Sequence, residues 1–253
     1  MGNSPLVSYV RLSPNHSGKR THAIDRITPH CVVGQLSVEA LGEVFCLASR
    51  SASCNYGIGA DGRIGLYCNE WNRSWCSSSN ANDQRAVTIE CASDLKEPYA
   101  FKDIVYKRLI ELCVDICRRN GKDKLIWIPN KTQALAYEPK ANEMLITVHR
   151  WFANKSCPGD WLYSRLTQLA NEVTTLLKKP SEKEGDDMAE NRYNEIKELP
   201  EFAKPTIKKL CDKGIIKGKG QKKDADGRPA DLNLSYDMLR LLVWNDRAGL
   251  YDE

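Results

Sequence analysis

The sequence of 253 residues lacks any long apolar run and any strong excess of charge of either sign. No segment approaches the roughly 18 apolar residues that a membrane-spanning helix needs, so we expect no insertion into a membrane. The net charge of +4 is too small to indicate a nucleic-acid partner, although it suits an anionic polymer such as a cell wall. A hydrophobic fraction of 42% and a charged fraction of 28% are typical of a globular protein.

The N-terminus lacks the basic-then-apolar order of a secretory signal, so export would need another route. A disulfide framework is also missing, because the ten cysteines are scattered along the chain and not clustered in turns. We interpret most of them as small buried hydrophobic residues of a protein made in a reducing compartment. Cys113 and Cys117, at helical spacing, are predicted to lie in the core and not to bind metal.

Short apolar runs alternate with amphipathic stretches over residues 1–178, which we predict to form one domain. This alternation predicts an α/β fold in which helices flank a central mixed sheet. Gly121 is placed to end the longest helix. The predicted helices are Val38–Ala48, Phe101–Arg119 and Asp160–Leu177, and the predicted strands are Ile27–Val33, Val87–Ala92, Lys124–Ile128 and Met144–Val148.

Residues 179–192 are highly charged and show no apolar periodicity, which predicts a linker. Beyond it, residues 193–253 show a helical pattern that finishes with a helix over Ser235–Ala248. About sixty residues form only a marginal core, so we expect a small appended module and not a second enzyme.

The four histidines are few enough for their positions to be informative. His30 ends one apolar run and His149 ends another. Cys157 follows His149 in the same segment, and the Pro-Gly pair after it favours a tight turn that presents the sulfur. Two imidazoles and one thiolate suffice for a catalytic zinc site, in which the fourth position stays open. Taken alone, a histidine at the end of a strand is more often a core or rim residue than a ligand, and the combination of the three residues favours the metal site.

His30, His149 and Cys157, with Lys155 two residues before the cysteine, resemble the zinc signature of the amidase-2 family. That family includes phage lysozyme-type amidases and peptidoglycan recognition proteins. The resemblance implies a Zn²⁺ cofactor held by these two histidines and the cysteine. It also implies hydrolysis of the amide between N-acetylmuramic acid and L-alanine.

Two further segments extend the resemblance in family order over about residues 25–178. Residues 55–64 are similar to a strand-turn-strand in which a tyrosine, here Tyr56, precedes an Asp-Gly turn. Residues 82–90 resemble a strand that ends in a glutamate, here Glu90. The joint match is more specific than any single piece of it.

The resemblance implies roles for the polar residues beside the ligands. Glu90 is the candidate general base, which takes a proton from water and passes it to the leaving nitrogen. Lys155 or Tyr56 would donate a hydrogen bond to the oxyanion that forms at the scissile carbonyl. Outside the resemblance, each would be an ordinary surface or rim residue. Trp71 and Trp75, between the two family segments, either contact sugar or stem peptide or cover the domain's own surface.

Residues 193–253 resemble a single S-layer-homology unit, a module that holds proteins to cell-wall polymers. The resemblance implies a secondary wall polymer as a partner. The chain departs from that family at residues 235–238, where Ser-Tyr-Asp-Met replaces Thr-Arg-Ala-Glu. The alternative is a helical hairpin used for dimerisation or for contact with the first domain.

These expectations describe a zinc N-acetylmuramoyl-L-alanine amidase that acts on bacterial peptidoglycan as a phage endolysin. Without a secretory signal, it would stay in the cytoplasm of the host bacterium until the membrane is breached, and would then act on the cell wall. A bacterial autolysin and a non-catalytic peptidoglycan-binding protein are the alternatives. Cys157 distinguishes the enzymes from the binding proteins, because family members that only bind lack the metal cysteine.

Overall fold

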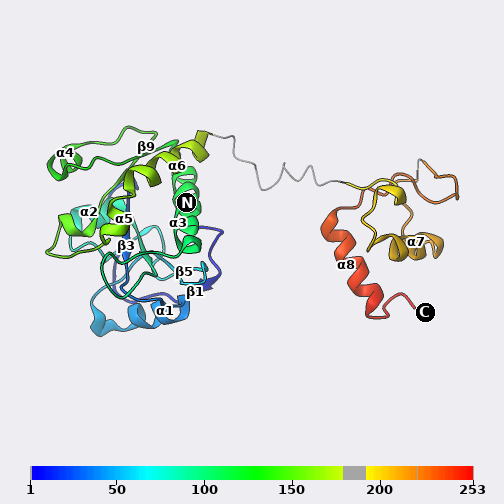
Figure 1. Ribbon diagram of the computed structural model, residues 1–253, viewed down its shortest axis with the longest axis horizontal. Coiled ribbons are helices and arrows are strands. Elements are labelled where there is room, and N and C mark those ends of the chain that lie inside the picture. The colour runs from blue at the N-terminus through cyan, green and yellow to red at the C-terminus, as the bar shows by residue number, and fades with distance from the viewer. Residues whose placement is uncertain (1, 179–191, 221, 253) are drawn as a thin grey trace. The chain divides into compact units, whose positions relative to one another are not determined.

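The computed structural model describes residues 2–178, 192–220 and 222–252 (Figure 1). The chain divides into two compact units, Met1–Lys179 and Pro180–Glu253, and each is described by itself. The predicted linker, residues 179–192, lies outside the described residues except for Arg192. In the described ranges, no helix is both long and apolar enough to cross a membrane.

A mixed seven-stranded sheet forms the centre of the first unit, in the order β1-β5-β4-β7-β3-β9-β8. Neighbouring strands are parallel except for β4 and β5, which are antiparallel. The predicted α/β class with a mixed sheet is confirmed. The strands are β1 (Tyr9–Val10), β3 (Arg26–Cys31), β4 (Tyr56–Ile58), β5 (Ile64–Leu66), β7 (Ala86–Cys91), β8 (Lys124–Ile126) and β9 (Glu143–Ile146), and a separate antiparallel pair joins β2 (His16–Lys19) to β6 (Asn72–Ser74).

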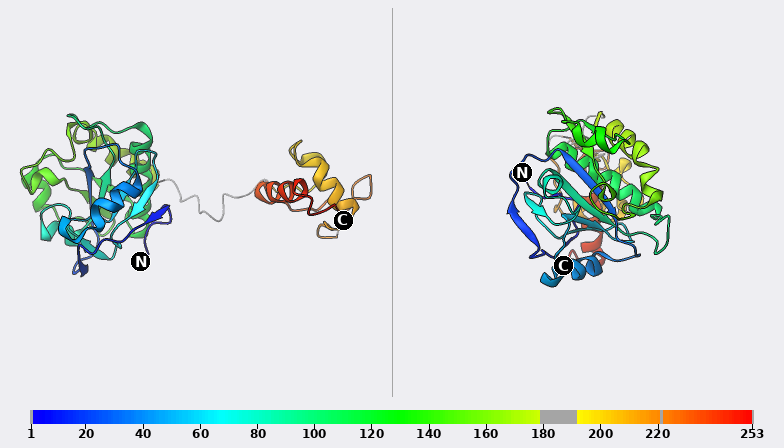
Figure 2. Two further views of the ribbon diagram at one scale, coloured as in Figure 1. Left: turned by 90° about the horizontal axis from the view of Figure 1, so that it is seen from below. Right: turned by 90° about the vertical axis from the view of Figure 1, so that its left-hand side faces the viewer.

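Helices cover both faces of this sheet (Figure 2). On one face α1 (Val38–Cys46) contacts β1, β4 and β5, and the Ser37 hydroxyl caps its first turn. On the other face α3 (Asp103–Arg119) contacts β4, β7 and α6 (Leu166–Lys178). The short helices are α2 (Asn80–Arg85), α4 (Lys131–Ala136), α5 (Asp160–Tyr163), η1 (Ala48–Arg50) and η2 (His149–Trp151).

The predicted elements are present with small shifts at their ends. The predicted helix Asp160–Leu177 is two helices, α5 and α6. The break arises because Arg165 N donates to Leu162 O, only three residues back, which tightens the chain and ends α5. All ten cysteines are free, and the predicted burial of Cys113 and Cys117 in the core is confirmed.

Strand alternation decides which residues of the sheet face the α1 side and which face α3. His30 in β3 pairs with Glu90 in β7, and Gly57 in β4 pairs with Glu90 from the other side. Tyr56 pairs instead with Ile89, and both belong to the buried cluster that includes α3. Because paired residues point to the same face, His30 and Glu90 lie side by side on one face and Tyr56 points to the other.

The second unit has a hydrophobic core of its own, built on η3 (Ile196–Glu198), α7 (Lys204–Asp212) and α8 (Tyr236–Arg247). Ser235 caps α8 by accepting a hydrogen bond from Met238 N at 3.1 Å, so the helix predicted over Ser235–Ala248 is confirmed. The buried residues of this core are Ile196, Leu199, Ala203, Ile207, Leu210, Leu232, Leu234, Leu239 and Val243.

Candidate metal centre

Two histidines meet at the edge of the sheet where the neighbouring strands β3 and β9 end. The strands β3 and β9 are parallel neighbours, so their carboxyl ends lie at the same edge of the sheet. His30 belongs to β3, and His149 begins η2, which follows β9 after two intervening residues. The two ring centroids are 5.1 Å apart, and His30 is 1% exposed. Burial lowers the pKa of both rings, so they are neutral at pH 7 and can bind a metal.

Cys157 joins the histidines from the loop that follows η2. Its Sγ lies 3.2 Å from His30 Nδ1. The loop is tied to η2 because Arg150 N donates to Cys157 O at 3.0 Å and Arg150 Nε donates to Ser156 O at 3.1 Å. Burial raises the pKa of the Cys157 thiol, whereas a divalent ion at this point would favour the thiolate.

The donor types and spacing of these three side chains fit a metal ion. One donor atom from each of His30, His149 and Cys157 lies within 4.8 Å of the others. Zinc bonds of ~2.0 Å to nitrogen and ~2.3 Å to sulfur, arranged as a tetrahedron, separate the ligand atoms by about 3.5 Å. The 3.2 Å between Cys157 Sγ and His30 Nδ1 is close to that separation. The structure thus brings the three predicted ligands together.

Glu90 lies beside this group with its side chain 14% exposed. Its Oε1 is 3.9 Å from His30 Nδ1, whereas its Oε2 is buried and has no hydrogen-bond partner among the described residues. Burial raises the pKa of Glu90 to about 7. A carboxyl group that titrates near neutral pH can both take up and release a proton during a reaction.

Two side chains of the segment 76–78 also contact the histidines, and no sequence pattern singles them out. Cys76 Sγ lies 3.4 Å from His30 Nε2 and 3.9 Å from Glu90 Oε1. Ser78 Oγ lies 3.1 Å from His149 Nε2. The only signal in the sequence is a serine-rich stretch before α2, which indicates a loop but no contact with a ligand.

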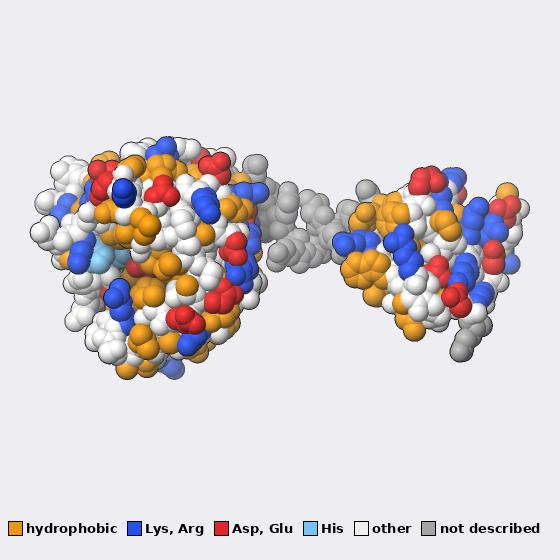
Figure 3. Space-filling model, turned by 60° about the horizontal axis from the view of Figure 1, so that its bottom comes forward, with side chains coloured by type: hydrophobic (Ala, Val, Ile, Leu, Met, Phe, Trp, Pro, Cys, Tyr) orange, Lys and Arg blue, Asp and Glu red, His pale blue; other side chains and the backbone are white. Residues whose placement is uncertain are grey.

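A pocket of about 410 Å³ opens beside the cluster. Valine and phenylalanine side chains form an apolar wall, while Trp75 and Tyr99 add aromatic surface. Two exposed cations, Arg50 and Lys155, also line it. Figure 3 shows histidine, hydrophobic and basic side chains close together on one face of this unit. Such a pocket suits a substrate with both apolar and anionic groups.

Of the residues proposed from the sequence to contact substrate, Lys155 and Trp75 line the pocket and Trp71 does not. The charge of Lys155 adds to burial in lowering the pKa of His149. Trp75 lines the pocket and its indole donates to Ser17 Oγ at 2.7 Å. Trp71 is 42% exposed and is absent from the lining residues, so its predicted contact with substrate has no support here.

Tyr56 does not reach the pocket. It is fully buried, its hydroxyl donates to Glu70 Oε2 at 2.6 Å, and it accepts a hydrogen bond from Ser4 N at 2.9 Å. Alternation along β4 turns its side chain to the α3 face, opposite to Glu90. The predicted role of Tyr56 as a donor to the oxyanion is therefore wrong.

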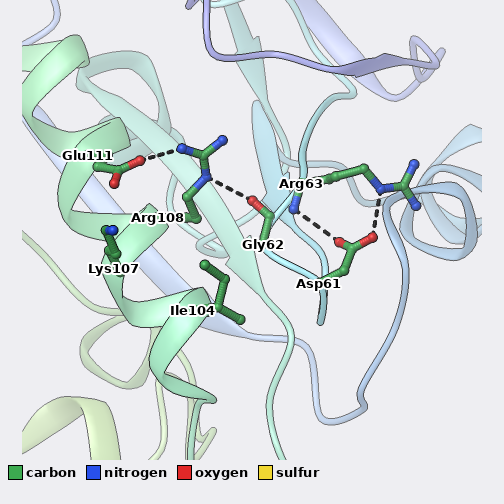
Figure 4. A pocket seen from close by; sticks show the side chains of 7 residues that line it. All are labelled: Asp61, Gly62, Arg63, Ile104, Lys107, Arg108 and Glu111. Atoms are coloured by element: carbon green, nitrogen blue, oxygen red, sulfur yellow. Dashed lines mark hydrogen bonds and ion pairs between the residues drawn. The ribbon is translucent and has the colours of Figure 1, made fainter. Parts of the chain in front are cut away.

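A second pocket, of about 240 Å³, lies between the turn after β4 and α3 (Figure 4). Both arginines that line it have partners: Arg63 Nε donates to Asp61 Oδ2 at 2.6 Å, and Arg108 donates to Glu111 and to the carbonyl of Gly62. The hydrogen bond from Arg108 Nε to Gly62 O, at 3.0 Å, joins the helix to the turn, so we assign this pocket a structural role.

Comparison with known proteins gives one family. Residues 20–160 match a family model described as N-acetylmuramoyl-L-alanine amidase, whereas no curated protein sequence matches the chain. Similar solved structures include a mutant endolysin from Bacillus subtilis, at 13% identity over 65% of this chain and 97% of that one, with a TM-score of 0.44. Another is the endolysin amidase LysCS from Clostridium intestinale, at 15% identity over 65% and 97%, with a TM-score of 0.43. A third is the hydrolase AmiA of Staphylococcus aureus, at 11% identity over 69% and 85%, with a TM-score of 0.45.

Proposed function

The chain belongs to the N-acetylmuramoyl-L-alanine amidase family, and we propose that it hydrolyses the amide between N-acetylmuramic acid and L-alanine with a zinc ion as cofactor. The proposed ligands are His30, His149 and Cys157. The observation that carries the proposal is that these three donors, from separate elements, meet beside Glu90 at a pocket. Three protein ligands leave one position open, which is typical of catalytic and not of structural zinc.

A zinc ion held there would polarise the scissile carbonyl and activate water near neutral pH. Glu90 is proposed to take a proton from the attacking water and to deliver it to the leaving nitrogen. Its pKa of about 7 suits both transfers, because the group is neither a strong acid nor a strong base at neutral pH. The buried Oε2, without a partner among the described residues, is an acceptor available to that water.

The two cations of the pocket are proposed to bind charge on the substrate. The Lys155 ammonium would donate a hydrogen bond to the oxyanion of the tetrahedral intermediate. Arg50 has no ion-pair partner among the described residues, so its guanidinium is available to a carboxylate of the stem peptide. Trp75 would supply a flat surface for the sugar or the peptide.

The test is to replace Cys157 with Ser and to measure zinc content and hydrolysis in the same preparation. Wild type should hold one zinc ion per chain and should release new amino groups from purified peptidoglycan without new reducing sugar ends. Cys157→Ser should lose both the zinc and the amino-group release. Cys46→Ser, a substitution of a half-buried cysteine on α1, is the matched control and should retain both. Full activity in Cys157→Ser would refute the proposal.

For the second unit we propose binding to a wall polymer, as its resemblance to an S-layer-homology unit implies. The support is a group of exposed apolar side chains on α8, namely Tyr236, Leu241 and Trp244, and the Phe202 ring lies 5.8 Å from that of Tyr236. Aromatic rings of this kind can stack on sugars. The full chain should sediment with purified cell walls, whereas residues 1–178 alone should sediment less. Equal sedimentation would favour the alternative, a hairpin that contacts other protein surfaces.

A catalytic unit followed by a second compact unit supports a wall-lytic role for the whole chain, and we propose that it acts as a phage endolysin. Added from outside to intact cells, such a protein should lyse them only when no outer layer blocks its access to the cell wall. A bacterial autolysin would show the same chemistry. A non-catalytic binding protein would sediment with walls but release no amino groups.

A further inference from the structure

The Nε2 atoms of both proposed metal histidines are in contact with one short segment of the chain, residues 76–78. Cys76 Sγ lies 3.4 Å from His30 Nε2, and Ser78 Oγ lies 3.1 Å from His149 Nε2. Neither residue is among the proposed ligands. Two rings from different elements therefore have the same nitrogen occupied by side chains only two residues apart.

The occupied nitrogen decides which nitrogen can bind the ion. A neutral imidazole carries one N–H donor and one lone pair, and the hydrogen bond made by one nitrogen fixes the role of the other. His30 Nδ1 faces the third ligand, because Cys157 Sγ lies 3.2 Å from it. His30 Nε2 is then the donor, with Cys76 Sγ as its acceptor. In His149, Ser78 Oγ occupies Nε2, which leaves Nδ1 as the nitrogen that can bind the ion; Ser78 Oγ would then accept from Nε2.

The segment is itself held in place. The buried carboxylate of Asp83 accepts hydrogen bonds from Cys76 N at 3.1 Å and from Ser77 N at 3.1 Å. Ser78 adopts a φ of 62°, a left-handed conformation that a serine keeps only when its neighbours impose it. Directly after it, Ser79 caps α2 by accepting from Asn82 N at 3.3 Å.

The same segment is hydrogen-bonded, through the side chain of Asn82, to β3 and to the residues after β9, which carry the two histidines. Asn82 Nδ2 donates to Ser77 Oγ at 3.2 Å and to Thr28 Oγ1 at 3.0 Å. Asn82 Oδ1 accepts from Thr147 Oγ1 at 2.9 Å. Thr28 and Thr147 each lie two residues before a proposed ligand, His30 or His149. The position of residues 76–78 relative to both rings is thus determined by direct contacts.

We propose that Cys76 and Ser78 are positioning residues that orient both histidines with Nδ1 toward the metal ion. This inference rests on the proposed function, because it requires that His30 and His149 bind zinc. Outer partners of metal-bound histidines hold the ring in place and raise its basicity, and their loss typically weakens metal affinity by about 10–100-fold.

The first test measures the zinc dissociation constant of Cys76→Ala and Ser78→Ala by competition with a chelator. Each variant should bind zinc about 10–100-fold more weakly than wild type. Cys76→Ser keeps an acceptor at this position and should bind within a few-fold of wild type. Cys46→Ala removes a half-buried thiol from α1 and should change nothing. Ser78 is exposed, so its substitution keeps the test usable even if Cys76→Ala fails to fold.

The second test assigns the bound nitrogens directly. Nitrogen NMR of the zinc-loaded wild type with labelled imidazoles should show protonated Nε2 and metal-bound Nδ1 in both rings. Zinc bound through Nε2, or unchanged affinity in both alanine variants, overturns this inference alone. Two zinc ions per chain, falling to one in Cys76→Ala, would also overturn it, because Cys76 would then be a ligand. A wild type that binds no zinc overturns the proposed function as well.

Discussion

Replacing Asn82 with Ala tests whether the metal centre depends on polar contacts in the interior of the first unit. The Asn82 side chain is fully buried. Its amide makes hydrogen bonds of 2.9 to 3.2 Å with the hydroxyls of Thr147, Thr28 and Ser77. The substitution removes these three bonds, together with a longer one of 3.4 Å from Arg26 Nη1, and leaves the hydroxyls with fewer partners.

The size of the effect follows from the three bonds to hydroxyls, because the contact with Arg26 is long for a hydrogen bond. A buried hydrogen bond contributes about 1 kcal/mol, so the free energy of unfolding of the first unit should fall by about 3 kcal/mol. In a unit of this size, each kcal/mol lowers Tm by ~2–4 °C, which gives a decrease of about 6–12 °C. Thr28 and Thr147 still bond to each other at 2.7 Å, which places the expected decrease toward the lower end.

Thermal unfolding followed by circular dichroism measures this decrease, with and without zinc. The matched control is Asn142→Ala, because that exposed amide donates to Asp123 Oδ1 at 2.9 Å but lies on the surface. The control should change stability by less than about 0.5 kcal/mol. Asn82→Ala should also weaken zinc binding, because it frees the segment 76–78. A Tm no lower than that of the control would refute the reasoning.

Three further predictions concern the site and the second unit. Glu90→Gln should lower kcat by about 10²–10⁴-fold with zinc content unchanged, and a loss of zinc would instead make Glu90 a ligand. A chelator should abolish amino-group release and added zinc should restore it; activity that persists without metal contradicts the zinc requirement. Hydrogen bonds from Lys209 and Thr206 lower the pKa of Asp246, so their stabilisation is full above about pH 4 and is lost as the pH falls through that lowered pKa. Denaturant unfolding at pH 7 and pH 3 checks this: Asp246→Asn should lose part of the pH dependence of the second unit, because the pKa values of Asp212 and Glu198 are lowered too, and an unchanged dependence contradicts the assignment.

The positions of the two proposed histidine ligands can be predicted from the sequence, because the ends of strands can be predicted. An apolar run that stops at a histidine places that histidine at the edge of a buried sheet, and parallel neighbours end at the same edge. His30 and His149 both end such runs, and β3 and β9 are parallel neighbours. The order of these runs along the chain does not show that the strands are adjacent, so the meeting of the two rings requires the structure.

Tyr56 shows where this kind of prediction fails. Tyr56 and Glu90 lie on different strands, and a shift of one residue in their pairing moves a side chain to the opposite face. The structure pairs Gly57 with Glu90, so Gly57 takes the position on β4 that faces the same side as Glu90. A Cβ at residue 57 would lie 2.5 Å from the Tyr67 ring, so this position has no room for a side chain. Register, which depends on such contacts, excludes Tyr56 from the site.

The segment 76–78 could not be predicted for a different reason. Its conformation depends on Asp83, whose carboxylate accepts from backbone N–H groups six and seven residues earlier. An aspartate in the first turn of a helix has many possible partners, and the sequence does not show which N–H groups it binds. The contacts of Cys76 and Ser78 with the histidines follow from that choice.

The apolar runs in the sequence do not reveal the polar contacts that hold the segments carrying His30 and His149. In β3, alternation places Thr28 on the same face as His30, and the Thr28 hydroxyl lies 2.7 Å from that of Thr147. Valine at both threonine positions would fit the apolar pattern as well, because it has nearly the same shape. It would nevertheless leave the buried amide of Asn82 without two partners, and the segment 76–78 without its tie to the strands. The apolar pattern predicts that both histidines lie at the edge of the sheet. It does not predict that they lie at a metal-binding distance from each other, because that distance depends on Asn82 and the two threonines.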